Sequence, residues 1–153
     1  TAVDISSSQY RATIYINSAD QRNGTDDTDI FIVKSIDKGN TWNKPIKVNL
    51  DATKSHQFLT WMSIDPKTGY IYIVYYDRSK HKNMLTDVVL AVSTDGGSSF
   101  SNTTISESPF EPDPNVFFGD YNNISAYNGI IRPVWTRLEK DTLSIWTALI
   151  KTK

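Results

Sequence analysis

Three arginines follow predicted strands at corresponding points of the sequence, Arg22 in "SADQR", Arg78 in "YYDR" and Arg137 in "VWTR". A planar guanidinium binds a carboxylate through two parallel hydrogen bonds, so arginines that converge could form an anion-binding ring. The alternative is that each arginine bonds within its own segment, for example to Asp20 or Asp77. The sequence leaves both interpretations open.

A second group of candidates lies in and around the segment "FFGDYNN". Asp120 and Tyr121 enter a predicted strand and carry groups suited to acid–base or nucleophilic chemistry, with Phe118 beside them as a ligand contact. The equivalent point earlier in the chain, "HQFLTWM", offers His56 and Trp61, and the indole ring could stack on a sugar. The alternative for all of these residues is packing inside the fold.

Glutamates are scarce, since Glu107, Glu111 and Glu139 are the only ones in the chain. Glu139 follows Arg137 by two residues and is the best placed of them to take part in catalysis. The other two lie in "ISESPFEPDP", where the prolines predict a solvated loop. A charged loop tip is the alternative for Glu139.

The segment "DQRNGTDDTD" is rich in carboxylates and suggests a calcium ion near Asp20, Asp27 and Asp29. Calcium prefers hard oxygen ligands, but the spacing here does not match that of an EF-hand loop. An acidic loop between two strands is the alternative, and no other metal site is predicted.

The composition narrows the range of functions. The chain has 153 residues, 39% of them hydrophobic, with a net charge of -1 and a pI near 6.0, so it offers no electrostatic basis for binding nucleic acid or an anionic membrane. Cysteine is absent, which excludes disulfides, thiolate metal sites and cysteine nucleophiles. No apolar run is long enough to span a bilayer.

The elements that must position these residues are short strands. Alternation and β-branched or aromatic content predict strands over 12–19, 29–35, 45–49, 57–64, 70–77, 87–93, 101–106, 122–127, 130–136 and 143–150. Turn signals such as Asn23-Gly24 and Asn128-Gly129 separate them. Many closely spaced strands without helical periodicity predict an all-β fold.

Features of the chain recur after about 57 to 60 residues, which identifies an internal repeat. Asp37 recurs as Asp95, and Gly69 in "TGYIYIVYYDR" recurs as Gly129 in "NGIIRPVWTR". Each repeat holds about four predicted strands, the content of one β-propeller blade. We therefore expect a β-propeller of four-stranded antiparallel blades, with repeats at approximately 1–54, 55–113 and 114–153.

Two copies of one eight-residue pattern, "SIDKGNTW" and "STDGGSSF", lie between the third and fourth predicted strands of a repeat. The aspartate is expected to accept backbone hydrogen bonds, the glycine to adopt a positive φ, and the aromatic ring to fold back and become buried. We therefore assign a structural role to both copies. The residues concerned are Ser35, Asp37, Gly39, Trp42, Ser93, Asp95, Gly97 and Phe100.

These two segments resemble Asp boxes, the bacterial neuraminidase repeats of the sialidase superfamily. The resemblance extends over the whole chain and implies the C-terminal part of an exported bacterial protein related to glycoside hydrolases, which would be secreted, periplasmic or at the cell surface. Catalysis of that type would use arginines around a carboxylate, a tyrosine nucleophile assisted by a glutamate, and an aspartate acid/base. The matching candidates here are Arg78, Arg137, Asp120, Tyr121 and Glu139, whereas Arg22, His56, Trp61 and Phe118 are candidates for ligand binding. A non-catalytic module that binds glycans or proteins is the alternative.

The ends of the chain fall inside predicted repeats, so about two and three-quarter blades of a six-bladed ring are expected. The expected partners are a carbohydrate ligand and the remaining blades, which would come from another chain or from self-association. Propellers need about four to eight blades to close.

Overall fold

The computed structural model describes residues 1–113, 115–119, 121–139 and 142–152. Their regular structure consists of strands arranged in three four-stranded antiparallel sheets, without a helix in the described ranges, which confirms the all-β prediction. Within these ranges, accordingly, no helix is long and apolar enough to cross a membrane.

The strands follow the chain order through the three sheets. The first sheet contains β1 (Ala2–Val3), β2 (Ile14–Asp20), β3 (Asp29–Ser35) and β4 (Ile46–Lys47). The second contains β5 (Gln57–Ile64), β6 (Ile71–Asp77), β7 (Asp87–Ser93) and β8 (Ser101–Thr104). The third contains β9 (Asn123–Tyr127), β10 (Ile130–Glu139), β11 (Thr142–Thr147) and β12 (Ile150–Lys151).

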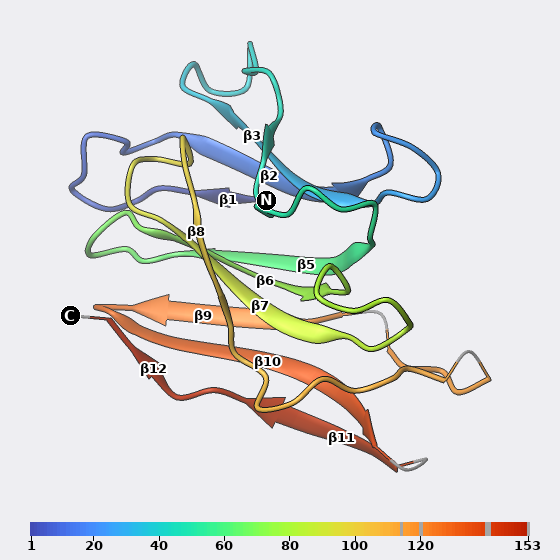
Figure 1. Cartoon of the computed structure of the whole chain (residues 1–153). Coiled ribbons are helices and arrows are strands. Elements are labelled where there is room, and N and C mark those ends of the chain that lie inside the picture. The colour runs from blue at the N-terminus through green and yellow to red at the C-terminus, as the bar shows by residue number, and fades with distance from the viewer. Residues whose placement is uncertain (114, 120, 140–141, 153) are drawn as a thin grey trace.

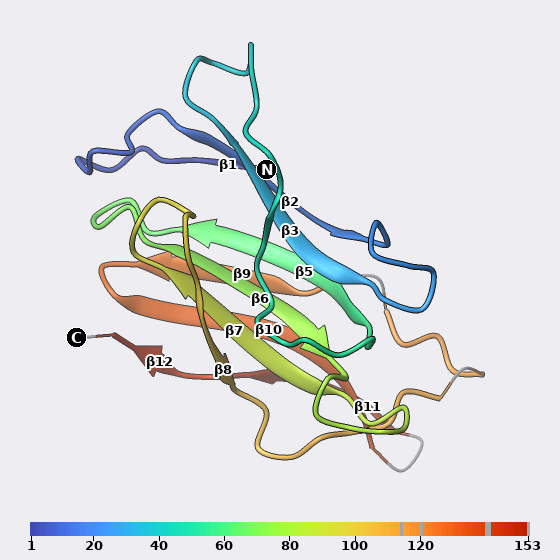
Figure 2. The same cartoon turned by 45° about the horizontal axis from the view of Figure 1, so that its top comes forward.

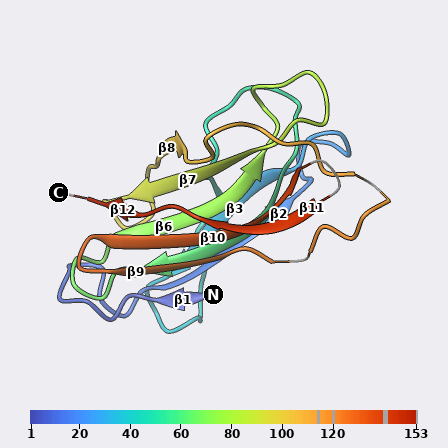
Figure 3. The same cartoon turned by 90° about the horizontal axis from the view of Figure 1, so that it is seen from below.

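The three sheets are stacked, with the second sheet between the first and the third (Figure 1). The turned view keeps this order and places the N-terminus beside the first sheet and the C-terminus beside the third (Figure 2). Seen from below, the long strands of all three sheets run in roughly the same direction (Figure 3). This is the aligned packing that twisted antiparallel sheets adopt face to face.

The middle sheet is buried on both faces because its strands alternate between two apolar clusters. All seven residues of β6 are buried. Since side chains along a strand point to opposite faces in turn, Ile73 and Tyr75 join a cluster with the first sheet, whereas Val74 and Tyr76 join a cluster with the third. The sequence "IYIVYYD" is therefore apolar throughout rather than alternating.

The third sheet has four strands but only three rows. Ile131 pairs with both β9 and β12, and Val134 pairs with both β9 and β11. Strands β11 and β12 therefore lie end to end along the same edge of β10. The prediction of one continuous strand over 143–150 is therefore wrong, because this segment forms two strands.

Pro133 in β10 explains the interruption between β11 and β12. Its carbonyl accepts a hydrogen bond from Thr147 Oγ1 at 2.8 Å, so its backbone faces the edge that β11 and β12 occupy. Its nitrogen has no hydrogen to donate toward that edge. The ladder therefore breaks opposite Pro133.

The two repeated segments form the turns that join β3 to β4 and β7 to β8, as predicted. In the first, Asp37 accepts hydrogen bonds from the Thr41 N–H at 2.9 Å and the Ser35 hydroxyl at 2.7 Å. In the second, Asp95 accepts the Ser99 N–H at 3.0 Å and the Ser93 hydroxyl at 2.8 Å.

The glycines of these turns have the predicted backbone conformation. Gly39 has φ +90° and Gly97 has φ +74°, a region that L-residues with a side chain rarely adopt. The N–H of Gly39 donates to Ser35 Oγ, and that of Gly97 donates to Ser93 Oγ. The serine, aspartate and glycine therefore build the turn together, and the structural role of the segments is supported.

The aromatic residues of the two segments differ in burial. Phe100 is 9% exposed and belongs to the cluster between the first and second sheets, as predicted. Trp42 is 41% exposed, so its predicted burial is wrong. The first sheet packs over Phe100 of the second sheet. No sheet among the described residues packs over Trp42 of the first sheet in the same way.

The stability of the chain is expected to fall in acid partly through Asp95. Partial burial opposes its ionisation, but hydrogen bonds from Ser99, Ser93 and Ser98 outweigh this and lower the pKa of Asp95 from 3.8 to about 2. Because the folded pKa is depressed, the carboxylate stabilises the fold above pH 3.8, and this contribution is lost as the pH falls toward 2.

Urea denaturation at pH values of about 5, 3 and 2 tests this expectation. The decrease in unfolding free energy over this range should be smaller for Asp95→Asn than for the unmodified chain. Glu107→Gln, at an exposed loop position, serves as control and should keep the full decrease. An identical pH dependence for all three proteins would contradict the role of Asp95.

Candidate functional site

A groove of about 350 Å³ lies where the second and third sheets meet, with Trp61 and Tyr121 on its wall. Their ring centroids are 6.2 Å apart and the rings meet edge to face. Trp61 is 39% exposed and Tyr121 is 74% exposed. Two residues that the sequence analysis singled out are therefore adjacent and accessible to a ligand.

A bulge in β5 sets the position of Trp61. The pairing register of β5 with β6 shifts between Phe58 and Trp61, and Leu59 has φ +49°. Bulges redirect the side chains that follow them and recur beside functional sites. Here the bulge brings the indole to the groove.

Asn122 ties the Tyr121 side of the groove to this bulge. It is 3% exposed, and its Nδ2 donates to the backbone carbonyl of Leu59 at 2.7 Å. Its Oδ1 has no hydrogen-bond partner among the described residues, although buried polar atoms are usually paired. Asn122 was not predicted from the sequence, although the two consecutive asparagines in "DYNN" were an available signal.

The remaining walls of the groove combine amide, hydroxyl and apolar groups. Asn123 and Thr136 supply polar atoms, and Val134, Trp135 and Ile145 supply apolar surface. Aromatic rings flanked by amides suit the apolar C–H face and the hydroxyls of a sugar ring.

Two other predicted ligand contacts are not among the residues that line this groove. Phe118 packs against Tyr76 and Phe110, with ring centroids 5.3 and 5.5 Å apart, respectively. His56 shares a hydrogen bond of 2.9 Å with Thr28 Oγ1, which ties the start of the second sheet to the first sheet. Both contacts stabilise the packing of elements. Asp120 lies outside the described residues.

Each of the three arginines is held within its own surroundings. Arg22 forms a bidentate hydrogen-bonded pair with Asp20, and this pair raises the pKa of Arg22 and lowers that of Asp20. Arg78 Nε donates to Thr86 Oγ1 at 3.1 Å, and burial lowers the pKa of Arg78.

Arg137 is held by the connection that leads into the third sheet and by its own sheet. It is 5% exposed, and its Nη2 donates to Ser108 Oγ at 2.7 Å and lies 3.7 Å from Glu139 Oε1. Arg22 and Arg137 share one feature, because the guanidinium of each lies over an aromatic ring. The guanidinium carbon is 4.3 Å from the ring centroid of Phe31 in Arg22 and 4.9 Å from that of Trp146 in Arg137. These contacts favour the local interpretation over an anion-binding ring.

Two of the three predicted calcium ligands near β3 are engaged with protein partners, whereas the buried Asp27 Oδ1 has no hydrogen-bond partner among the described residues. Asp20 pairs with Arg22, and Asp29 accepts hydrogen bonds from Lys47 Nζ at 2.7 Å and Asn49 Nδ2 at 2.6 Å. The described part of the chain holds no group of three or more histidine, cysteine, aspartate or glutamate residues that could bind a metal ion. The calcium site near Asp20, Asp27 and Asp29 therefore stays a prediction from the sequence.

Comparisons with known proteins give information on the fold alone. No family model and no curated protein matches the sequence. Among solved structures, a protein of unknown function from Dyadobacter fermentans DSM 18053 is similar, with a TM-score of 0.56 and 17% sequence identity. The match covers 91% of this chain and 34% of that chain, so this chain spans about a third of its structural neighbour. Similarity at this identity shows a shared fold.

Proposed function

We propose that this chain is part of a sialidase-like β-propeller that binds glycans, without hydrolysing them, in the groove between Trp61 and Tyr121. The observation that carries the binding proposal is the pair of exposed rings 6.2 Å apart, beside a buried asparagine with an unpaired oxygen. In this proposal each four-stranded sheet is one blade, and the protein acts outside the cell or at its surface.

The local bonding of the arginines supports binding rather than hydrolysis. A sialidase-type site would need guanidinium groups free to meet a carboxylate, but Arg22 is paired with Asp20 and Arg137 is 5% exposed. The guanidinium of Arg22 is therefore committed to its own sheet, and that of Arg137 to the contact between the third sheet and the connection that holds Ser108.

An apolar face on the third sheet supports the ring proposal. Three side chains on this face that do not line the groove are at least 44% exposed: Tyr127, Ile130 and Leu143. Together they form an apolar patch of the kind that marks an interaction surface. A further blade, from another chain or from a second copy, would cover it.

Trp61→Ala is expected to weaken glycan binding by about tenfold, because aromatic stacking contributes roughly 0.5–1.5 kcal/mol beyond buried area. Binding of the 153-residue chain to a panel of sialylated and neutral oligosaccharides identifies the ligand, and titration then gives the affinity. Trp42→Ala is the matched control, since Trp42 is 41% and Trp61 39% exposed, and it should bind as well as the unmodified chain.

Two results would contradict the proposal. Equal losses in Trp61→Ala and Trp42→Ala, or no bound oligosaccharide in the panel, would remove the groove as the binding site. Release of fluorophore from a fluorogenic sialoside by the chain would contradict the non-catalytic part of the proposal.

A further inference from the structure

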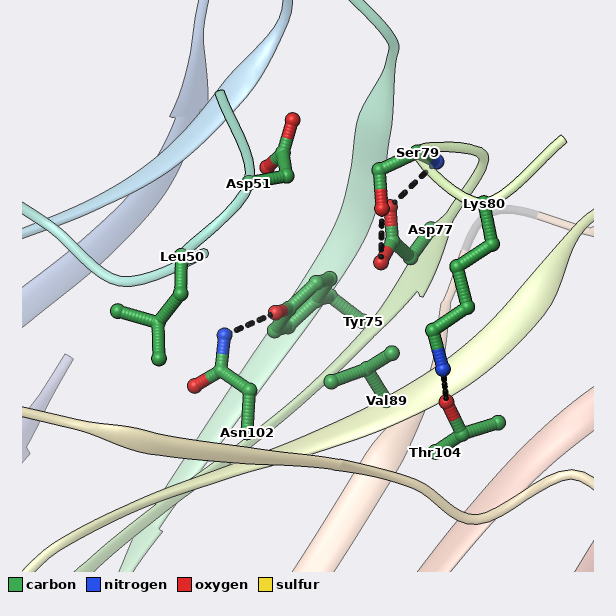
Figure 4. A pocket seen from close by; sticks show the side chains of 9 residues that line it. All are labelled: Leu50, Asp51, Tyr75, Asp77, Ser79, Lys80, Val89, Asn102 and Thr104. Atoms are coloured by element: carbon green, nitrogen blue, oxygen red, sulfur yellow. Dashed lines mark hydrogen bonds between the residues drawn. The ribbon is translucent and has the colours of Figure 1, made fainter. Parts of the chain in front are cut away.

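A second pocket, of about 200 Å³, lies between the second sheet and the connection from β4 to β5, and it shares no lining residue with the groove. Leu50 and Asp51 reach it from the segment after β4, Tyr75 and Asp77 from β6, Val89 from β7 and Asn102 from β8. Figure 4 shows these side chains around one space, with the Asn102 amide bonded to the Tyr75 hydroxyl. The pocket contains both polar and apolar walls.

Tyr75 and Asn102 together present an unused donor and an unused acceptor. Asn102 Nδ2 donates to Tyr75 Oη at 2.8 Å and to the carbonyl of Val48 at 3.1 Å. The buried Oδ1 of Asn102 accepts no hydrogen bond from the described residues, and the O–H of Tyr75, which is 1% exposed, finds no acceptor among them. An adjacent donor and acceptor match the two hydrogen-bonding capacities of a hydroxyl group.

Asp77 and Asp51 give the same pocket negative charge. Asp77 is 8% exposed and accepts hydrogen bonds from Gln57 Nε2 at 2.9 Å and Ser79 N at 2.8 Å. Asp51 accepts a hydrogen bond from Thr53 Oγ1 at 2.7 Å. The ion pairs of the described residues involve other carboxylates, so both charges lack a cationic partner there.

The negative charge acts on the tyrosine. Burial, followed by the charges of Asp77 and Asp51, raises the pKa of Tyr75 above its ordinary value. Tyr75 therefore keeps its proton and remains a donor. Hydrogen bonds compensate part of the cost of both carboxylates, but no cation among the described residues neutralises them, so a cationic group in the pocket would be stabilised.

We infer that this pocket binds a small molecule that carries a protonated primary amine and a hydroxyl, such as an amino sugar with a free amine. The ammonium group donates to Asp51 and Asp77, the hydroxyl meets Tyr75 and Asn102, and the carbon skeleton packs on Leu50 and Val89. The pocket is smaller than the roughly 300–1,000 Å³ of drug-sized sites, which limits the ligand to about one ring. This inference is independent of the glycan groove.

Lys80 is the internal competitor for such a ligand. It lines the pocket, but its Nζ donates to Thr104 Oγ1 at 2.5 Å rather than to either carboxylate. A ligand ammonium would meet repulsion from this charge. Lys80→Met should therefore strengthen binding of a cationic ligand, by a factor of about two to five at moderate salt.

Titration of the 153-residue chain with glucosamine, glucose and N-acetylglucosamine, followed by NMR, tests the inference. The three sugars share ring and hydroxyls, and only glucosamine carries a cationic amine. We expect glucosamine to bind about tenfold or more tightly than the other two, because hydrogen bonds to charged groups are the stronger ones. Its shifts should centre on Val89, Tyr75 and Asn102.

Variants of Asp51 and Asp77 test whether these carboxylates bind the amine of glucosamine. Asp77→Asn and Asp51→Asn should each weaken glucosamine binding about tenfold, with Glu107→Gln as the neutral control. Asp51 lies in a partly exposed connection, so Asp51→Asn remains informative if Asp77→Asn unfolds the chain. Trp61→Ala should leave glucosamine binding unchanged, which separates this pocket from the groove.

Three results would overturn the inference. Equal affinity for the three sugars would show recognition of hydroxyls alone. Unchanged binding in Asp51→Asn together with a folded Asp77→Asn would remove both carboxylates from the site. Absence of binding at glucosamine concentrations on the order of 10 mM would show that the pocket does not take this class of ligand.

Discussion

Replacement of Ile73 by alanine is expected to lower the free energy of unfolding by about 2–5 kcal/mol, the range for large apolar residues cut back to alanine in a core. Ile73 is fully buried in β6, the second strand of the middle sheet. It packs in one cluster with Tyr15 and Ile32 of the first sheet. The shorter side chain would leave a cavity between the first two sheets. The backbones of both sheets are fixed by their own strand pairing, so neither can move to fill the cavity.

Urea denaturation followed by tryptophan fluorescence and by circular dichroism measures this loss. Ile36→Ala is the matched control, because Ile36 is 83% exposed in the turn after β3. We expect this control to stay within about 0.5 kcal/mol of the unmodified chain. Similar losses in the two variants would contradict the assignment of the core to the space between the first two sheets.

Replacement of Tyr76 by phenylalanine is the second large effect. The fully buried Tyr76 hydroxyl donates to the carbonyl of Thr136 at 2.6 Å and accepts from the N–H of Thr136 at 3.0 Å. It is therefore a direct link between the middle sheet and β10. The variant keeps the ring but leaves a backbone donor and acceptor unpaired, at a cost of roughly 1–3 kcal/mol for each group.

Tyr72→Phe provides the control for this prediction. Tyr72 lies on the same face of β6 and is also fully buried, but its hydroxyl has the Thr152 side chain near it rather than backbone groups of β10. Removal of this hydroxyl leaves no backbone group unpaired, so it should lower the free energy of unfolding by less than about 1 kcal/mol. A greater loss in Tyr72→Phe than in Tyr76→Phe would show that the link to Thr136 does not stabilise the stack.

The strands were largely predictable because their signals are local. The predicted bounds 29–35, 57–64 and 87–93 agree with β3, β5 and β7. The turn chemistry of Asp37 and Asp95 was equally accessible, since each carboxylate binds groups within four residues of itself. The break between β11 and β12 was missed because it depends on Pro133, which lies on the neighbouring strand.

The candidate site was only partly predictable. Trp61 and Tyr121 were singled out individually, but the contact between them requires two sheets to pack and Asn122 to bond to Leu59. The second pocket was missed altogether. Its polar groups come from two strands and two connections, and none of the corresponding segments looks unusual in the sequence.

The sequence by itself determined an all-β chain, the position of most strands and the chemistry of the two repeated turns. These features follow from alternation along a strand and from φ preferences within a few residues. Only the tertiary structure decided which apolar faces are buried. Phe100 and Trp42 occupy equivalent positions, yet one is 9% and the other 41% exposed, because burial depends on whether another sheet covers the residue.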